Sequence, residues 1–146
     1  MIAADTSTWI AFLGGGPGDD VHLLDRALMD GQVLMVPVVL TELLSDPKLP
    51  SDTAARLCQM PMVEIEAGYW ERAGVLRAKA LAKHRKARLG DALIAQSCID
   101  RNIPLITRDR DFHAFAEATG LNLLDVTLQT FALHHSASLR AGFQRR

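Results

Sequence analysis

The sequence predicts an α/β protein in which one parallel sheet of five strands is covered by helices on both faces. Short apolar runs alternate with longer segments of helical periodicity along the chain, which is the pattern of repeated βαβ units. Strands joined in this way run parallel and are buried on both faces. The length of 146 residues fits one domain with one core.

Five apolar runs carry the strand prediction. The first, "MIAAD", stops at the polar cluster Thr6-Ser7-Thr8, and the fourth, "PLIT", leads into the acidic stretch "RDRDF". In chain order, the expected strands are residues 1–5, 32–36, 62–66, 104–107 and 121–126.

Helical patterns fill the segments between these runs. Leu24 and Leu28 share a face at helical spacing, and Pro37 fits a first helical turn, where its missing N–H is not needed. Ser51 or Asp52 is expected to cap the helix after it. In chain order, the expected helices are residues 9–12, 21–28, 37–46, 51–59, 69–86, 90–102 and 112–120.

Composition excludes several classes of protein. A hydrophobic fraction of 49% and a net charge of -1 are those of a globular protein without a global attraction to nucleic acid. The N-terminus lacks a basic leader, and the longest apolar run, "VLMVPVVL", is too short to span a bilayer. We therefore expect a soluble, cytoplasmic protein whose two cysteines are buried free thiols.

The expected domain covers residues 1–133. The remaining residues, 134–146, form a polar tail that we expect to be partly disordered. His134 and His135 lie in this tail, where paired histidines are usually solvated.

Acidic residues follow the ends of the predicted strands. Asp5 follows the first strand, Glu42 lies one turn into the helix after the second, and Asp109 follows the fourth. Right-handed crossovers place these ends at one edge of the sheet, so the three carboxylates should converge there. Asp91 opens the helix before the fourth strand and joins them only if that helix starts at the same edge, which the pattern leaves open.

Each acid also has a purely structural explanation. Asp5 and Asp91 could be helix N-caps, and Glu42 could be a solvated position on a helix. Asp111 precedes Phe112 and further apolar residues at helical spacing, so we expect it to cap the last helix and to leave Asp109 for the sheet edge.

Taken together, the acids predict a metal site. Two carboxylates a few ångströms apart repel by about 4 kcal/mol at an effective dielectric constant near 20. Such a cluster persists with a bound cation or with raised pKa values. Ligand sets made only of oxygen suit Mg²⁺ or Mn²⁺.

Four segments in this order, "ADTSTWI", "LTELL", "LGDALIA" and "LITRDRDF", resemble the PIN-domain nucleases, and within them the VapC-like toxins of bacterial and archaeal toxin–antitoxin pairs. The resemblance runs from Asp5 to about Val126. It implies a PIN-like three-layer sandwich and a Mg²⁺- or Mn²⁺-dependent endoribonuclease, typically homodimeric and inhibited by a cognate antitoxin. It also implies that cleavage leaves 5′-phosphate and 3′-hydroxyl ends.

The same resemblance implies roles for individual residues. Thr6 or Ser7 and Thr107 would assist by hydrogen bonding near the metal. Glu42 would bind a second ion or orient the attacking water. The implied catalytic quartet is Asp5, Glu42, Asp91 and Asp109, with Asp5, Asp91 and Asp109 as the metal ligands.

A basic segment precedes Asp91. Residues 72–90 carry seven basic residues and no acid, which fits either a solvated helix face or a basic wall that guides RNA phosphates. Two further arginines flank Asp109 and are expected to point outward, toward RNA or a neighbouring acid. The candidate RNA-binding residues are Lys83, Arg85, Lys86, Arg88, Arg108 and Arg110.

Three other interpretations are weaker. A phosphoryl-transfer protein of the receiver or haloacid type would carry paired or alternating aspartates after the first strand, where this chain has "DTST". A PIN fold that has lost catalysis would lack part of the quartet. "GGGPGDD" follows a helix and lacks the Gly-Lys-Ser/Thr ending of a phosphate-binding loop, so we expect a flexible loop near the site.

Overall fold

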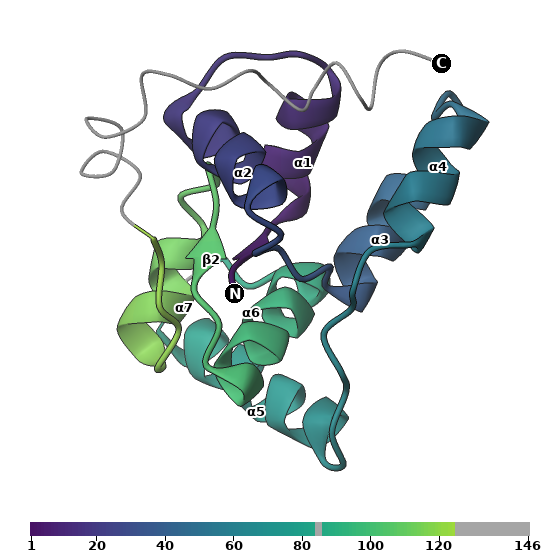
Figure 1. Cartoon of the computed structure of the whole chain (residues 1–146). Coiled ribbons are helices and arrows are strands. Elements are labelled where there is room, and N and C mark those ends of the chain that lie inside the picture. The colour runs from purple at the N-terminus through teal and green to yellow at the C-terminus, as the bar shows by residue number, and fades with distance from the viewer. Residues whose placement is uncertain (84–85, 125–146) are drawn as a thin grey trace.

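The computed structural model describes residues 1–83 and 86–124, and it has the α/β architecture expected from the sequence (Figure 1). Strands β1 (Ala3–Ala4) and β2 (Leu105–Ile106) pair in parallel, with Ala3 opposite Leu105. The helices of the described residues are α1 (Thr6–Leu13), α2 (Asp19–Met29), α3 (Pro37–Leu44), α4 (Ser51–Cys58), α5 (Tyr69–Ala82), α6 (Leu89–Arg101) and α7 (Phe112–Ala118).

The five-stranded sheet is not confirmed, because only β1 and β2 form a continuous ladder within the described residues. The other three runs are held by single parallel bridges: Ile2 with Val33, Met35 with Met62, and Leu105 with Leu123. Prolines bound two of these runs, since Pro37 starts α3 directly after the second and Pro61 precedes the third. The bridges nevertheless place the five runs side by side in the order 3-2-1-4-5.

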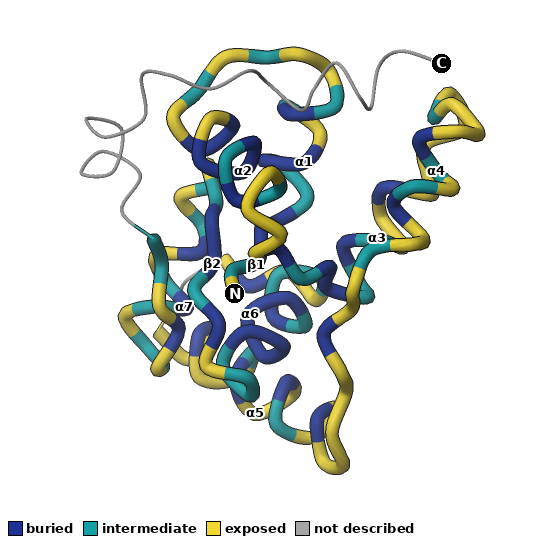
Figure 2. Tube along the Cα trace, viewed as in Figure 1, coloured by how far each residue is buried: buried dark blue, intermediate teal, exposed yellow. Residues whose placement is uncertain are grey.

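Helices cover the strand region from two sides. Figure 1 shows α1 and α2 on one side of the strands and α5, α6 and α7 on the other, with α3 and α4 along an edge. The inward faces of these helices are buried (Figure 2). Trp9 and Phe12 of α1 pack edge to face, with ring centroids 5.8 Å apart, while Phe112 and Phe115 of α7 fill the other side. This core fixes the ends of β1 and β2, from which the acidic residues project.

Three local predictions are wrong. Pro50 occupies the N-cap position of α4, so Ser51 and Asp52 lie inside its first turn. Helix α5 ends at Ala82, short of residue 86. Cys98 is buried as expected, and burial raises the pKa of its thiol to about 12, but Cys58 at the end of α4 is exposed.

Within the described residues, no helix is both long and apolar enough to cross a membrane. The end of the fifth predicted strand, the boundary at residue 133 and the tail with His134 and His135 lie outside the described residues.

Candidate metal centre

Asp5 is the most buried acid at the edge formed by the ends of β1 and β2, with 3% of its surface exposed. Its carboxylate caps α1 by accepting a hydrogen bond from the Thr8 amide, and it accepts two more from the Ser7 and Thr107 hydroxyls at 2.9 and 2.7 Å. Burial raises the pKa of Asp5 above its usual range, although these hydrogen bonds act in the opposite direction. These neutral donors fix the orientation of the carboxylate.

Three further carboxylates gather at this edge. Asp91 in the first turn of α6, Asp109 after β2 and Asp111 each offer one oxygen, and these oxygens lie within 4.8 Å of one another. Helix α6 thus begins at the same edge, which the sequence pattern left open. The cluster comes from two segments that meet only in the folded chain.

Asp91 is electrostatically the most perturbed member of the cluster. Burial, and then the charge of Asp109, raise its pKa to about 6, while the positive charge of Arg88 lowers it. Its Oδ2 is buried and has no hydrogen-bond partner among the described residues. A buried anionic oxygen without a donor is costly, and a bound cation would offset this cost.

Asp111 does not cap α7 as expected. It occupies the N-cap position with helical backbone angles, φ -61° and ψ -25°, instead of the extended conformation typical of a side-chain cap. Its side chain makes no capping hydrogen bond within the described residues. Asp109 Oδ1 instead accepts a hydrogen bond from the Asp111 amide at 2.9 Å, and the Asp111 carboxylate joins the cluster.

Glu42 reaches the same edge from α3. The Thr6 hydroxyl donates a hydrogen bond to its Oε2, and its charge contributes to the raised pKa of Asp91. Thr6, Ser7 and Thr107, the supporting residues expected from the sequence, therefore contact Glu42 or Asp5 directly.

Arg108 points to a neighbouring acid, one of the two alternatives expected, but the sequence did not identify that acid as Asp20. Arg108, next to Asp109, donates to both carboxylate oxygens of Asp20 at 2.9 Å and to the carbonyl oxygen of Pro17 at 3.0 Å. Burial acts to raise the pKa of Asp20, but the hydrogen bonds and charge of Arg108 outweigh it and the pKa is lowered. No local pattern joins two residues so far apart in the chain.

This ion pair also explains one glycine of the loop "GGGPG". Gly18 has φ +145°, and a Cβ at this position would lie 2.7 Å from Arg108 Nη2. The loop therefore lies beside Arg108, next to Asp109, and its expected flexibility stays a prediction.

The basic residues of residues 72–90 divide into two groups. Arg72 binds Asp100, and Arg77 donates to the carbonyl oxygen of Ala87 at 2.8 Å. In contrast, Lys79, Lys83, Lys86 and Arg88 are exposed, as is Arg110 after β2, and Arg85 lies outside the described residues. The exposed basic side chains of the described part of this segment therefore run from Lys79 to Arg88.

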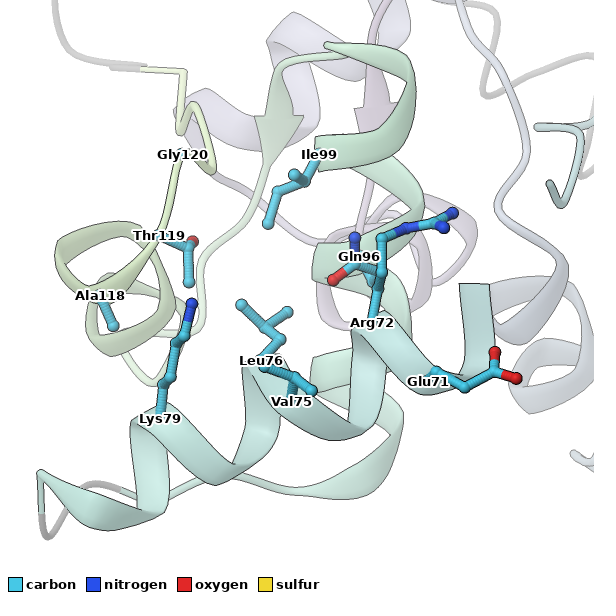
Figure 3. A pocket seen from close by; sticks show the side chains of 10 residues that line it. All are labelled: Glu71, Arg72, Val75, Leu76, Lys79, Gln96, Ile99, Ala118, Thr119 and Gly120. Atoms are coloured by element: carbon cyan, nitrogen blue, oxygen red, sulfur yellow. The ribbon is translucent and has the colours of Figure 1, made fainter. Parts of the chain in front are cut away.

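Two surface hollows of about 420 Å³ each differ in their relation to the acids. Figure 3 shows the first between α5, α6 and the end of α7, where Val75 and Leu76 face Ile99 and Thr119. None of the acids described above lines it. The second lies between α1 and α3 and is lined by Ile10, Leu13, Leu43 and also by Glu42. Only this second hollow opens next to the acidic edge.

The donor set fits a hard divalent cation. Three carboxylate oxygens lie close together, one of them is buried without a donor, and neither sulfur nor imidazole belongs to the cluster. Mg²⁺ and Mn²⁺ prefer such all-oxygen ligands. A bound cation would also offset the burial and the carboxylate repulsion that raise the pKa of Asp91.

Comparison with known proteins identifies relatives of this chain. Ribonuclease VapC5 of Mycobacterium tuberculosis (strain ATCC 25618 / H37Rv) is 27% identical over 128 residues, which cover 84% of this chain and 93% of that protein. A crystal structure of VapBC2 from Rickettsia felis bound to a DNA fragment from its promoter has a chain with a TM-score of 0.66 and 21% identity, covering 85% of this chain and 98% of that one. A structure of VapBC-5 from Mycobacterium tuberculosis gives a TM-score of 0.58 at 24% identity, covering 84% and 96%.

The two solved structures show that the fold is shared, and a match to a family shows which family the chain belongs to. The family described as PIN domain matches residues 2–118, which include every acid of the cluster as well as Asp5 and Glu42. The chain therefore belongs to the PIN domain family.

Proposed function

We propose that this protein is a Mg²⁺- or Mn²⁺-dependent endoribonuclease that acts as the toxin of a toxin–antitoxin pair. The observation that carries the proposal is the cluster of Asp91, Asp109 and Asp111 oxygens within 4.8 Å, beside Asp5 and Glu42. Its buried Asp91 oxygen lacks a donor among the described residues. The similarity to a protein named as a ribonuclease supports the same reaction.

Asp5, Asp91 and Asp109 would hold the metal, and the geometry adds Asp111 as a fourth candidate. A bound Mg²⁺ or Mn²⁺ would lower the pKa of a coordinated water and offset charge on the scissile phosphate. Ser7 and Thr107 fix the orientation of Asp5 by hydrogen bonding.

Glu42 has a different position from the ligand cluster. Thr6 holds one of its oxygens, and its side chain lines the hollow between α1 and α3. We propose that it orients the attacking water or binds a second ion, while exposed Lys83, Lys86, Arg88 and Arg110 contact the phosphates of the RNA.

We also propose a cognate antitoxin as partner and a homodimer as the assembly. One similar structure is described as a member of the VapBC family of toxin–antitoxin systems. A short reading frame directly upstream should encode the antitoxin. Its product should copurify with this chain and block RNA cleavage, and light scattering should give twice the chain mass. A neighbour that neither binds nor inhibits would argue against the toxin assignment.

The decisive experiment maps RNA ends. The purified protein is incubated with total RNA in Mg²⁺ or in EDTA, and the cleavage ends are sequenced. We expect defined cuts with 5′-phosphate and 3′-hydroxyl ends that require the metal and disappear in Asp5→Asn. Metal-dependent cuts that persist in Asp5→Asn would come from a contaminant or would mean that Asp5 is not a metal ligand. An absence of cuts at every RNA concentration would instead favour a PIN fold that binds without cutting.

A further inference from the structure

Gly90 lies against the carboxylate of Glu42. A Cβ at Gly90 would be 2.7 Å from Glu42 Oε1, well inside van der Waals contact. Glycine permits this kind of close approach because it has no side chain. The next residue along α6 is Asp91, so the contact brings Glu42 to the metal-ligand cluster.

The backbone at Gly90 does not itself require glycine. Gly90 lies in the first turn of α6 and is not among the glycines with positive φ, so an alanine could adopt its conformation. In a helix, glycine is also less favourable than alanine. The role of Gly90 is therefore to leave space for the Glu42 carboxylate, and not to adopt a special backbone conformation.

Glu42 needs such constraints because its helix does not supply them. The residue is exposed on α3, where a glutamate side chain normally samples several rotamers. Here the Thr6 hydroxyl holds Oε2 from one side, and the surface of Gly90 receives Oε1 from the other. Two separate elements, α1 and α6, thus fix one carboxylate group.

We propose that Gly90 is a positioning residue for Glu42: its missing side chain forms the slot that holds the Glu42 carboxylate beside Asp91. This inference rests on the proposed nuclease function and refines it. Any larger residue at position 90 displaces the end of a flexible side chain and leaves the backbone in place. Substitution of Gly90 therefore damages the site without damaging the fold.

The test compares Gly90→Ala with Gly74→Ala. Gly74 is a helical glycine of α5, and a Cβ added there would meet no described atom within 4 Å. Both variants should keep or raise the melting temperature of the metal-free protein, by up to about 2–4 °C. Only Gly90→Ala should lose RNA cleavage, by about ten- to a hundredfold, the cost of misplacing a catalytic group by about 1 Å.

A second pair of variants tests whether Gly90 acts through its contact with Glu42. Glu42→Asp shortens the side chain, so its carboxylate no longer reaches the new methyl group. Adding Gly90→Ala to Glu42→Asp should change the residual cleavage rate by less than about twofold. An equal loss in both backgrounds would mean that Gly90 acts on something other than Glu42, and the inference would be wrong.

A readout without metal separates this inference from the proposed function. A crystal structure of metal-free Gly90→Ala should show α6 unchanged and the Glu42 carboxylate displaced. An undisplaced carboxylate, or a melting temperature several degrees below that of wild type, would overturn the inference. Failure of the wild-type protein to cut RNA would instead overturn the proposed nuclease function, whatever the position of Glu42.

Discussion

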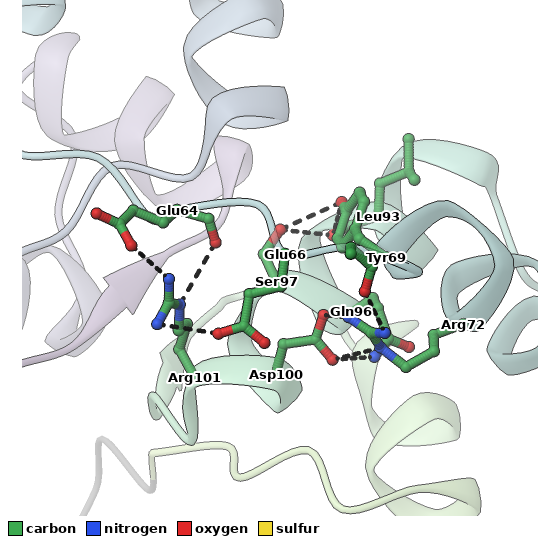
Figure 4. Close-up of polar contacts among 10 residues, drawn as sticks. Glu64, Glu66, Tyr69, Arg72, Leu93, Gln96, Ser97, Asp100 and Arg101 are labelled. Atoms are coloured by element: carbon green, nitrogen blue, oxygen red, sulfur yellow. Dashed lines mark hydrogen bonds and ion pairs between the residues drawn. The ribbon is translucent and has the colours of Figure 1, made fainter.

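Carboxylates at the acidic edge and carboxylates between α5 and α6 have opposite electrostatic surroundings. Between the two helices, Arg72 binds both oxygens of Asp100 at 3.0 and 2.7 Å, and Gln96 donates to the same carboxylate (Figure 4). The hydrogen bonds from Arg72 hold the pKa of Asp100 below its usual range. At the acidic edge, burial and neighbouring carboxylates raise the pKa of Asp91 to about 6.

The difference separates residues that stabilise the fold from residues that we propose as a metal site. Around Asp100 the network is satisfied: the Tyr69 hydroxyl also donates to the Leu93 carbonyl oxygen at 2.7 Å, and Arg101 pairs with Glu64. At the acidic edge, neighbouring carboxylates repel one another, and one oxygen of Asp91 has no donor in the described part of the chain. A protein selected only for stability would have no reason to keep such an arrangement.

The largest expected effect comes from exchanging one carboxylate in each region. Asp109→Asn keeps the size of the side chain but removes a charge that would hold the proposed metal, so RNA cleavage should fall by more than about a hundredfold. The melting temperature of the metal-free protein should stay the same or rise, because repulsion with Asp91 is relieved. Single-turnover cleavage and thermal melting measure the two properties on the same sample.

Asp100→Ala is the matched change in the other region. It removes the partner of Arg72, so the melting temperature should fall by a few degrees while cleavage stays within about twofold of wild type. If Asp100→Ala were inactive at full stability, or if Asp109→Asn cut normally, the division between the two regions would be wrong.

The sequence predicted the convergence of acids better than the sheet that brings them together. Asp5 and Asp109 follow strands that the apolar runs identify clearly, and right-handed crossovers place such ends at one edge. The continuous ladder, however, depends on backbone geometry around Pro37 and Pro61, which apolar patterning does not encode. The spacing of Asp111 alone predicts a cap, whereas its backbone angles decide the outcome.

The sequence could not predict contacts between distant segments of the chain. Asp20 and Arg108 form an ion pair, and Gly90 approaches Glu42, but neither pair shows a periodicity or a local motif. Such pairs depend on the packing of α2, α3 and α6 around the strands, and side-chain geometry alone reveals them.

The second largest effect concerns pH. Because the pKa of Asp91 is raised from 3.8 to about 6 in the folded protein, the folded state binds more protons than the unfolded state between these values. Stability of the metal-free protein should therefore fall as pH rises from about 4 to 6. The full linkage is about 3 kcal/mol, and solvent screening of this partly exposed carboxyl reduces it to about 1–2 kcal/mol.

Urea unfolding at several pH values in EDTA measures this dependence, with Asp91→Asn as the control. The variant should lose most of the slope between pH 4 and 6. Asp100 acts in the opposite direction and at lower pH, since its lowered pKa gives stability that is lost only as pH falls below about 4. A wild-type slope that is unchanged in Asp91→Asn would assign the titration to another group.

A smaller effect is expected at Asp111, where the structure corrects the sequence prediction. Asp111→Ala removes a carboxylate from the cluster but no capping hydrogen bond, so the free energy of unfolding should change by less than about 0.5 kcal/mol. The affinity for Mn²⁺, measured by calorimetry, should fall by about tenfold. A loss of about 1 kcal/mol or more in stability with unchanged Mn²⁺ affinity would restore the role of a helix cap.

The smallest expected effect concerns RNA binding by the basic segment. Here the comparison is between a basic side chain that is paired within the fold and basic side chains that are exposed. Arg72 is already bound to Asp100, whereas Lys83 and Lys86 are exposed near the start of α6. Each lysine that contacts a phosphate releases counterions, so Lys83→Ala/Lys86→Ala should flatten the salt dependence of single-strand RNA binding by about 0.7 per lost contact. Arg26→Ala removes an exposed charge from α2 and should leave the slope unchanged. Binding is measured with inactive Asp109→Asn as the background, between about 50 and 200 mM salt. Equal slopes in all three proteins would mean that these lysines are only a solvated face, and that the RNA is held by other residues such as Arg88 or Arg110.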